Sequence, residues 1–434
     1  MDFKEIYNIY KEHPIVTTDS RNCPNNSIFI ALKGANFNGN KFAKTALENG
    51  CSYAIVDDKD YYDSNSPQLI LVEDSLITYK KIAQKHREEF HIPIIGITGT
   101  NGKTTSKELI STVLTKKFNV LHTEGNFNND IGVPKTLLRI NHTHNIAVIE
   151  MGASHQGDIK KLVEYVEPTC GLITNVGYAH LEGFGSFEGV KKTKGELYDY
   201  LKTNNCLLFL NNSNKNLVKM AEDRHISNLT TYGQNSSAHI QGEFINCNPF
   251  LNFKWKSANN DTWHEVKTHL IGSYNIDNLL AAIAIGVHFN ISDEDICHAL
   301  ENYIPNNNRS QLIKTKKNNL IVDAYNANPS SMKAAIDNFK IMDVKNKMLI
   351  LGDMNELGES SAIEHQKIIE LINNYGLSNV WLVGDKFKQT NSTFKKFKDI
   401  TEVKEYIKTN CPVNQYILIK GSNTIRLFEL SNLL

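Results

Sequence analysis

Short apolar runs alternate with helical patterns along most of the chain. Between residues 305 and 434 four such runs recur, and each ends in Asp or in Lys-Gly-Ser. Runs of this length, bounded by turn residues, are typical of strands buried on both faces. Strands that alternate with helices predict a mostly parallel sheet covered by helices. The four predicted strands are 319–323, 347–353, 380–385 and 416–422.

The same alternation extends toward the N-terminus. Leu109, Ile110, Val113 and Leu114 recur at helical spacing and predict one buried helix face. Residues 232–270 are more polar and β-rich, which predicts either an insertion or edge hairpins. The other predicted strands are 27–34, 53–58, 93–97, 146–149, 170–176 and 206–210, and the other predicted helices are 41–48, 75–90 and 276–289.

The length of 434 residues predicts about three domains, at ~150 residues per domain. We predict an α/β protein with a small N-terminal α/β domain (1–88), a central domain with a P-loop-type, mostly parallel sheet (89–304), and a C-terminal Rossmann-like α/β domain (305–434).

Composition narrows the class of protein. The 47 basic and 47 acidic residues cancel, so nothing indicates a nucleic-acid partner. The N-terminus has no apolar signal core, and no apolar run is long enough to insert into a membrane. The seven cysteines are scattered without a CxxC pair, which predicts reduced thiols. Together these features predict a cytoplasmic protein.

The stretch GITGTNGKTT (96–105) follows one apolar run and precedes a helical pattern. A glycine-rich turn at a helix N-terminus points backbone N–H groups at a phosphate. Lys103 would reach the outer phosphates and Thr104 would ligate Mg²⁺. The match to G-x4-G-K-[ST] is imperfect, because Ile97 occupies the first glycine position, so a glycine turn with an incidental lysine is the alternative. The predicted ATP contacts in this loop are Gly99, Thr100, Asn101, Gly102, Lys103, Thr104 and Thr105.

Two further strand ends carry candidate magnesium groups. Glu150 ends AVIE, and His180 follows the strand that leads into TNVGYAH. Each residue alone is more simply a solvated surface group. Two such strand ends near one phosphate loop favour a site for Mg²⁺.

TGTNGKTT (98–105), Glu150, TNVGYAHLEGFGS (174–186) and TKGEL (193–197) together resemble the Mur ligase family. These ATP-dependent enzymes form the amide bonds of the peptidoglycan peptide stem. The resemblance implies that Glu150 and His180 are associated with Mg²⁺. It also implies that Lys194, if carbamylated, helps to place a second Mg²⁺; otherwise Lys194 is a plain helix lysine. The implied catalytic residues are Lys103, Glu150, His180 and Lys194.

A second motif, GSYNIDNLLAAIAI (272–285), resembles the family's nucleotide-contacting motif, with Tyr274 where the family usually has His. Without the resemblance it is an ordinary apolar helix with a polar start. Arg309 stands where the family has an Arg that reaches the phosphates, and Asp323 is expected to bond the ATP ribose. The further ATP contacts implied are Asn275, Asn278, Arg309, Asp323 and Asn326.

The ends of the chain indicate which substrates are used. Residues 17–50 resemble the uridine-nucleotide domain of the later Mur ligases, with Ser20 and Arg21 near the diphosphate; an exposed turn is the alternative. Residues 125–138 and 322–336 resemble the family member that adds D-alanyl-D-alanine. The implied substrate contacts are Ser20, Arg21, Asn126, Asn128, Asn129, Tyr325 and Asn328.

The resemblance implies a monomeric ligase that uses ATP and Mg²⁺ to join UDP-N-acetylmuramoyl-tripeptide to D-alanyl-D-alanine through an acyl phosphate. Rival interpretations are the ligase that adds the third stem residue, a folylpolyglutamate synthase, and a non-catalytic nucleotide switch. The third stem residue, diaminopimelate or lysine, stays open. So does the general base, for which Asp353 and His365 are only weak candidates.

Overall fold

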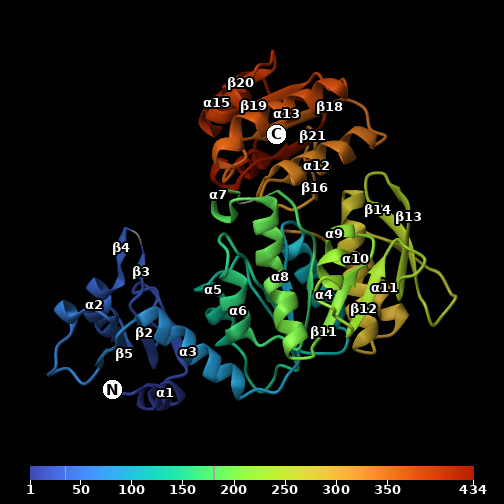
Figure 1. Ribbon diagram of the computed structural model, residues 1–434. Coiled ribbons are helices and arrows are strands. Elements are labelled where there is room, and N and C mark those ends of the chain that lie inside the picture. Colours follow the sequence, from blue (N-terminus) through green and yellow to red (C-terminus); the bar gives the residue numbers. More distant parts are fainter. Residues whose placement is uncertain (35, 179–180) are drawn as a thin grey trace. The chain divides into compact units, whose positions relative to one another are not determined.

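The computed structural model describes residues 1–34, 36–178 and 181–434. Figure 1 shows the chain coloured along its sequence. Its residues divide into two compact units. Unit 1 comprises residues 1–96, 121–151 and 161–168, and unit 2 comprises the remainder. Strand β7 (Ile94–Thr98) begins in unit 1 and ends in unit 2. Unit 1 extends past the predicted domain boundary at residue 88, and unit 2 includes residues on both sides of the one at 304. These two boundaries stay predictions.

Unit 1 contains a four-stranded parallel sheet whose two faces are both covered. Alternate residues of one strand point to opposite sides: Ile28 and Ile30 pack with Tyr79, whereas Phe29 packs with Ala43. This alternation explains why the strands read as continuous apolar runs. The strand order is β1 (Ile15–Thr17), β2 (Ser27–Ile30), β5 (Cys51–Val56), β6 (Leu69–Leu71), and the packed helices are α1 (Phe3–Glu12), α2 (Ala43–Glu48) and α3 (Ser75–Glu88).

The rest of unit 1 surrounds β9 (Ile146–Glu150), which lies between β7 and β8 (Val120–His122). All five residues of β9 are buried, including Glu150 at its end. The short helix α5 (Gly132–Leu137) precedes this strand.

Unit 2 holds the other strands of the central sheet. Their order is β15 (His264–Lys267), β14 (Leu251–Ser257), β13 (Ile240–Cys247), β12 (Leu229–Gly233), β11 (Leu207–Asn211), β10 (Cys170–Ile173), with the end of β7 next to β10. Strands β10 to β13 pair in parallel, whereas β13, β14 and β15 pair antiparallel. The edge hairpins predicted for residues 232–270 are thus confirmed.

Two helices of unit 2 pack closely against each other (Figure 1). They are α4 (Lys103–Leu114) and α10 (Ile276–His288). Leu109, Ile110 and Val113 of α4 are fully buried, as their spacing predicts. Gly286 of α10 permits this approach, because a Cβ there would lie 2.7 Å from Val113 Cγ1.

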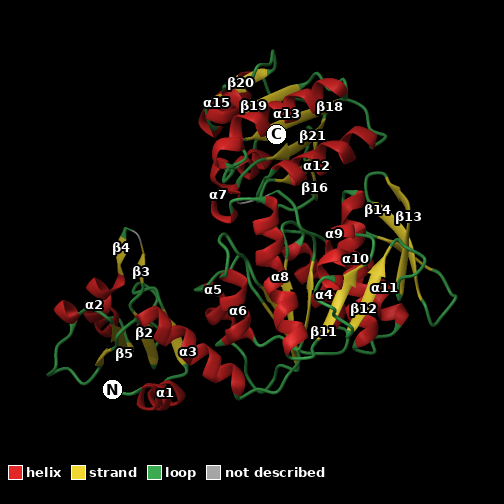
Figure 2. Cartoon of the chain, in the orientation of Figure 1, coloured by secondary structure: helices red, strands yellow, loops and turns green. Residues whose placement is uncertain are grey.

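The C-terminal part of unit 2 is a six-stranded sheet with helices between the strands (Figure 2). Leu349 and Leu418 pack on one face with α12 (Pro329–Ile341) and α13 (Ser361–Asn374), and Ile350 and Ile419 pack on the other with α15 (Ile400–Thr409). Only the edge strand β16 is antiparallel. The order is β16 (Gln311–Lys314), β17 (Asn319–Asp323), β21 (Tyr416–Lys420), β18 (Lys347–Gly352), β19 (Val380–Val383), β20 (Lys395–Phe397).

The predicted α/β class is confirmed, with one strand corrected. Residues 27–34 do not form a single strand, because β2 ends at Ile30. The chain then turns, and β3 (Lys33–Gly34) pairs antiparallel with β4 (Phe37–Asn38). All seven cysteines are unpaired. Within the described ranges, no helix is both long and apolar enough to span a bilayer.

A turn glycine in the C-terminal sheet offers a stability test. Gly384 has φ +119°, and a Cβ there would overlap the Asp353 carboxylate. Gly376 has φ +66°, but open space surrounds its missing Cβ. We predict that Gly384→Ala destabilises the protein by about 3 kcal/mol or more, from backbone strain plus overlap, and Gly376→Ala by only about 1 kcal/mol. Thermal unfolding of both variants measures the difference, and equal losses would contradict this account.

Candidate phosphate and nucleotide site

The loop between β7 and α4 adopts a shape that needs glycine at two positions. Gly99 has φ +144° and Gly102 has φ +80°, both in the region that favours glycine. A Cβ on Gly99 would overlap the Thr174 hydroxyl, and one on Gly102 would lie 2.6 Å from Asn278 Oδ1. The loop is therefore pressed between the end of β10 and the start of α10.

Lys103 and Thr104 open helix α4 directly after this loop. The Lys103 ammonium lies 2.8 Å from the Gly99 carbonyl oxygen and 3.0 Å from that of Thr100, so it folds back over the loop. A helix N-terminus carries positive potential and N–H groups that its own helix does not satisfy. The glycine turn, the cation and the helix start together fit a phosphate group.

Asn275 and Asn278, which are predicted to contact the nucleotide, are buried and belong to one chain of hydrogen bonds. Ser106 donates to Asn278 Oδ1 (3.0 Å), Asn278 donates to Asn275 Oδ1 (2.9 Å), and Asn275 donates to the carbonyl of Ile271 (2.9 Å). Their amides thus hold α10 against α4. Tyr274, which replaces the family's His, bonds through its hydroxyl to Ser310 Oγ at 2.9 Å.

The phosphate loop also contacts the N-terminal turn of α12. Asn328 caps this helix, and its Nδ2 donates to Asn101 Oδ1 at 2.7 Å. The Asn101 amide in turn donates to Ser330 Oγ at 2.9 Å. Predicted ATP and substrate residues are therefore brought together within unit 2, although 227 positions separate them.

Arg309 and Asp323 are both neighbours of Ser310, Arg309 along the chain and Asp323 through a hydrogen bond. The Arg309 guanidinium stacks 3.9 Å from the centre of the Tyr325 ring, and its Nε makes no hydrogen bond to any residue that the structure describes. Asp323 is ion-paired with buried Lys420 at 2.7 Å and accepts the Ser310 N–H at 3.3 Å. Lys420 also donates to the carbonyl oxygen of Asn326 at 3.2 Å. Asp323 therefore orients Ser310 and Lys420, in addition to its predicted hydrogen bond to a ribose.

Lys194 is the most unusual group of the site. It lies on α8 (Phe187–Thr203), is only 2% exposed, and its ammonium lies 5.3 Å from the centre of the Phe184 ring. Burial, and then the positive charge of Lys103, lower the pKa of Lys194 well below its ordinary value. A neutral amine is the form that reacts with carbon dioxide, so this environment fits a carbamylated lysine.

In unit 1, Glu150 is buried at the end of β9, and Asn128 donates to its Oε1 at 2.7 Å. Such an oriented carboxylate suits a hard cation. Asn129 Oδ1 accepts the N–H groups of Ile131 and Gly132 in the turn that leads into α5, and Asn126 is exposed. Asn129 therefore has a structural task that its sequence position did not reveal.

Ser20 and Arg21 lie in a turn of unit 1. Arg21 forms a two-pronged pair with Asp19, at 2.9 Å for each hydrogen bond, and this pairing lowers the pKa of Asp19 to about 2. The Arg21 side chain is 88% exposed. A diphosphate would have to share this guanidinium with Asp19.

The structure gives hydrogen-bond partners for the two weak general-base candidates, His365 and Asp353. His365 accepts the Met354 N–H at 3.0 Å and lies 2.7 Å from the Ser361 carbonyl, and Asp353 accepts the N–H groups of Lys386 and Phe387. Both weak candidates for a general base thus accept hydrogen bonds from backbone N–H groups. His180 lies outside the described residues. Within those residues, no three His, Cys, Asp or Glu side chains are grouped to hold a metal.

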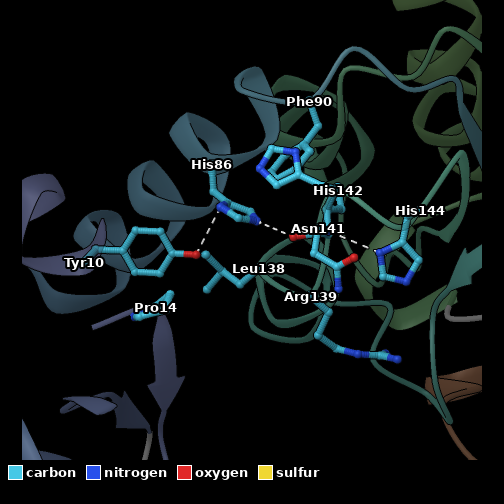
Figure 3. Close-up of a pocket in the computed structure, with 10 residues that line it drawn as sticks. Tyr10, Pro14, His86, Phe90, Leu138, Arg139, Asn141, His142 and His144 are labelled. Carbon is cyan, nitrogen blue, oxygen red and sulfur yellow. Dashed lines mark hydrogen bonds between the residues drawn. The ribbon is translucent and has the colours of Figure 1, made fainter. Parts of the chain in front are cut away.

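A separate cavity of about 540 Å³ lies in unit 1 and contains none of the predicted site residues (Figure 3). His86 is one of the residues that line it and lies 3.1 Å from the Tyr10 hydroxyl and 2.8 Å from the Ile140 carbonyl oxygen. Burial lowers the pKa of His86. These bonds tie α1 and α3 to the segment after α5.

Four residues of the site were missed from the sequence: Thr174, Asn175, Ser330 and Lys420. Each lies inside or beside a motif, and Lys420 ends a predicted strand. Their position at the C-terminal ends of strands or at a helix start was the available signal. Their partners, far away in the chain, gave no signal.

Comparison with known families covers almost the whole chain. Residues 13–100 match the Mur ligase family catalytic domain, 97–286 the Mur ligase middle domain, and 308–423 the Mur ligase glutamate ligase domain. The chain belongs to the Mur ligase family. It is 32% identical over 430 residues to UDP-N-acetylmuramoyl-tripeptide--D-alanyl-D-alanine ligase of Bacillus subtilis, covering 96% of this chain and 92% of that protein.

The Escherichia coli protein of the same name is 33% identical over 423 residues, with the same coverage of the two chains. Among solved structures, MurF from Acinetobacter baumannii matches with a TM-score of 0.86 and 28% identity, over 96% of this chain and 92% of that one. The MurF ligase of Thermotoga maritima in complex with ADP matches with a TM-score of 0.85 and 25% identity, over 96% of both chains.

Lys103 provides the first test of this site. We predict that Lys103→Ala lowers turnover by about 10²–10³-fold or more while the protein stays folded, because a cation over the phosphates stabilises developing charge. Lys116→Ala, just beyond the end of the same helix and exposed, serves as the matched control. Turnover and circular dichroism are measured for both. Near-normal turnover of Lys103→Ala would remove the loop from the mechanism.

Lys194 provides a test with a stability readout. Because its pKa is depressed in the folded protein, the unfolded chain binds the proton more tightly, and wild-type stability rises with pH toward about 10.4. We predict that Lys194→Met melts at or above the wild-type temperature at pH 7, that this gain shrinks as the pH rises, and that turnover falls by about 10²–10³-fold.

The Lys194 measurement is thermal unfolding of both proteins across this pH range in buffer free of carbon dioxide, with turnover assayed separately. Normal turnover of Lys194→Met would refute a role in the reaction. A melting temperature well below wild type would show that the charged group stabilises the fold.

Proposed function

We propose that this protein uses ATP to add D-alanyl-D-alanine to UDP-N-acetylmuramoyl-tripeptide, which yields the UDP-N-acetylmuramoyl-pentapeptide precursor of peptidoglycan. The observation that carries the proposal is the match, at 32–33% identity over 96% of the chain, to relatives that bear the name of this activity. The phosphate loop, with its two required glycines and Lys103, supports the use of ATP.

The reaction has two steps. An oxygen of the terminal carboxylate of the tripeptide attacks the γ-phosphorus of ATP, and ADP leaves with the bridging oxygen. The amine nitrogen of D-alanyl-D-alanine then attacks the carbonyl carbon of the acyl phosphate. The tetrahedral species loses a proton and expels phosphate with the electron pair of the C–O bond. Phosphorylation is needed because a carboxylate is a poor electrophile.

The chain's own residues bind and align crowded anions. Lys103 donates to two carbonyl oxygens of the loop, which supports its proposed contact with the outer phosphates. Arg309, held flat on Tyr325, presents further positive charge from the C-terminal segment. Asn101, Asn328 and Ser330 connect the loop to α12, so that the nucleotide and the C-terminal segment are oriented together.

Magnesium fits the donor groups that are present. In unit 2, Thr104 at the first turn of α4 and Lys194 as a carbamate would supply oxygen ligands. Glu150, a buried carboxylate of unit 1 that accepts a hydrogen bond from Asn128, is proposed as a ligand from the family resemblance. His180 is proposed with them from the family resemblance. A bound Mg²⁺ would neutralise phosphate charge during transfer.

The rival ligases are less well supported. The structure of the ligase that adds 2,6-diaminopimelate matches with a TM-score of 0.56 and 17% identity, which indicates a shared fold. A folylpolyglutamate synthase from L. casei matches with a TM-score of 0.60 over 83% of this chain.

We place the protein in the cytoplasm, where its nucleotide substrates would be found.

The test is phosphate release from ATP, Mg²⁺ and UDP-N-acetylmuramoyl-tripeptide, with and without D-alanyl-D-alanine. We expect release only when the dipeptide is present, since the acyl phosphate needs the amine to complete turnover. Carriers that contain diaminopimelate or lysine are compared in parallel to identify the third residue. Lys116→Ala should match wild type, and Lys103→Ala should release phosphate about 10²–10³-fold more slowly or not at all.

Release that does not depend on the dipeptide would contradict the proposal. No release from the tripeptide carrier, together with release from a dipeptide carrier plus free diaminopimelate or lysine, would assign the protein to the preceding step instead.

A further inference from the structure

Asn175 follows β10 at the point where the chain passes the phosphate loop. Its carboxamide makes two hydrogen bonds to the backbone of a single loop residue. Asn175 Oδ1 accepts the N–H of Asn101 at 3.0 Å, and Asn175 Nδ2 donates to the carbonyl oxygen of Asn101 at 3.0 Å. Asn175 therefore bonds only backbone atoms of residue 101, and these two hydrogen bonds do not depend on which side chain that residue carries.

Neighbouring groups reinforce this grip. The Thr174 hydroxyl donates to the same Asn101 carbonyl at 2.6 Å. The N–H of Thr100 donates to the backbone carbonyl of Asn175 at 2.9 Å. Both backbone groups of residue 101 are therefore directed at the end of β10.

The direction of that carbonyl decides where the next N–H points. In a trans peptide the C=O and the following N–H point in opposite directions. Holding the Asn101 carbonyl against β10 therefore turns the N–H of Gly102 away from β10. Gly102 accepts either sign of φ, so without a restraint this peptide could rotate at little steric cost. A rotated peptide would present a carbonyl oxygen where the loop needs a donor.

The same logic applies to the preceding peptide. The Asn101 N–H is held by Asn175 Oδ1, so the Thr100 carbonyl in that peptide points the other way. That carbonyl accepts from the Lys103 ammonium at 3.0 Å. The Asn175 side chain thus orients two successive peptides of the loop. Through the 100–101 peptide it also orients the carbonyl oxygen that the Lys103 ammonium contacts.

We infer that Asn175 is a positioning residue that fixes the orientation of the 100–101 and 101–102 peptides, and so keeps the loop in the form that binds the nucleotide phosphates. This inference rests on the proposed use of ATP at the loop. A purely structural interpretation, in which Asn175 only closes the end of β10, predicts lost stability without a specific loss of nucleotide affinity.

The experiment measures ADP affinity by calorimetry in the presence of Mg²⁺, with the full chain as wild type, Asn175→Ala and Asn175→Asp. Asn175→Ala removes both bonds, and we expect about tenfold weaker ADP binding. Asn175→Asp keeps an acceptor for the Asn101 N–H but sets a carboxylate oxygen against the Asn101 carbonyl. We expect a larger loss for this variant, and added salt should narrow its gap to wild type because the extra charge is screened.

Asn214→Ala is the matched control. Asn214 also bonds backbone through its amide, but it caps its own helix α9 (Lys215–Glu222) by accepting from Asn216 and Leu217. We expect it to lower the melting temperature slightly and to leave ADP affinity unchanged. In the dipeptide-dependent assay, Asn175→Ala should raise the KM for ATP and leave the KM for the carrier unchanged.

ADP affinities of Asn175→Ala and Asn175→Asp within twofold of wild type would overturn the positioning role. If Asn175→Ala does not fold, the nearly isosteric Asn175→Asp decides alone. A wild-type protein that does not bind ADP would overturn both this role and the proposed function. A wild type that binds ADP but ignores D-alanyl-D-alanine would sink only the proposed acceptor, because ADP affinity does not involve it.

Discussion

The candidate site depends on a backbone loop that is held from two sides. The end of β10 bonds the peptides around Asn101, and the start of α10 presses Asn278 against Gly102. A backbone anion site works only if several N–H groups point inward together, and short peptides do not hold such an arrangement alone. The strand β10, the helix α10 and the packing of α10 on α4 therefore all serve the geometry of about ten residues.

A second feature is that several polar side chains predicted to be functional are buried, although burying a polar group costs stability. Asn275, Asn278, Thr104 and Lys194 are buried in unit 2, and Glu150 is buried in unit 1. The asparagines satisfy one another, so their burial rigidifies the start of α10. Lys194 instead has its pKa lowered by burial and by the charge of Lys103, a kind of perturbation that is common at functional sites.

Several features could be read from the sequence because their cause is local. The strands of the C-terminal sheet follow from short apolar runs, and the buried face of α4 follows from helical spacing. The phosphate loop follows from glycine content between a strand and a helix. Where the prediction failed at residues 27–34, an apolar run continued past a turn, and only pairing with β4 separated Lys33 and Gly34 from the strand.

The sequence by itself determined the element order, the α/β class and the membership of the family, because periodicity and motif spacing are properties of neighbouring residues. Tertiary structure alone decided what each polar group bonds. Asn128 meets Glu150, Asn175 meets the backbone of Asn101, Asn101 meets Asn328, and Asp323 meets Lys420. These partners lie 22 to 227 positions apart, and the pairing of an amide or a carboxylate depends on the angle at which two folded segments approach. No local pattern encodes that angle.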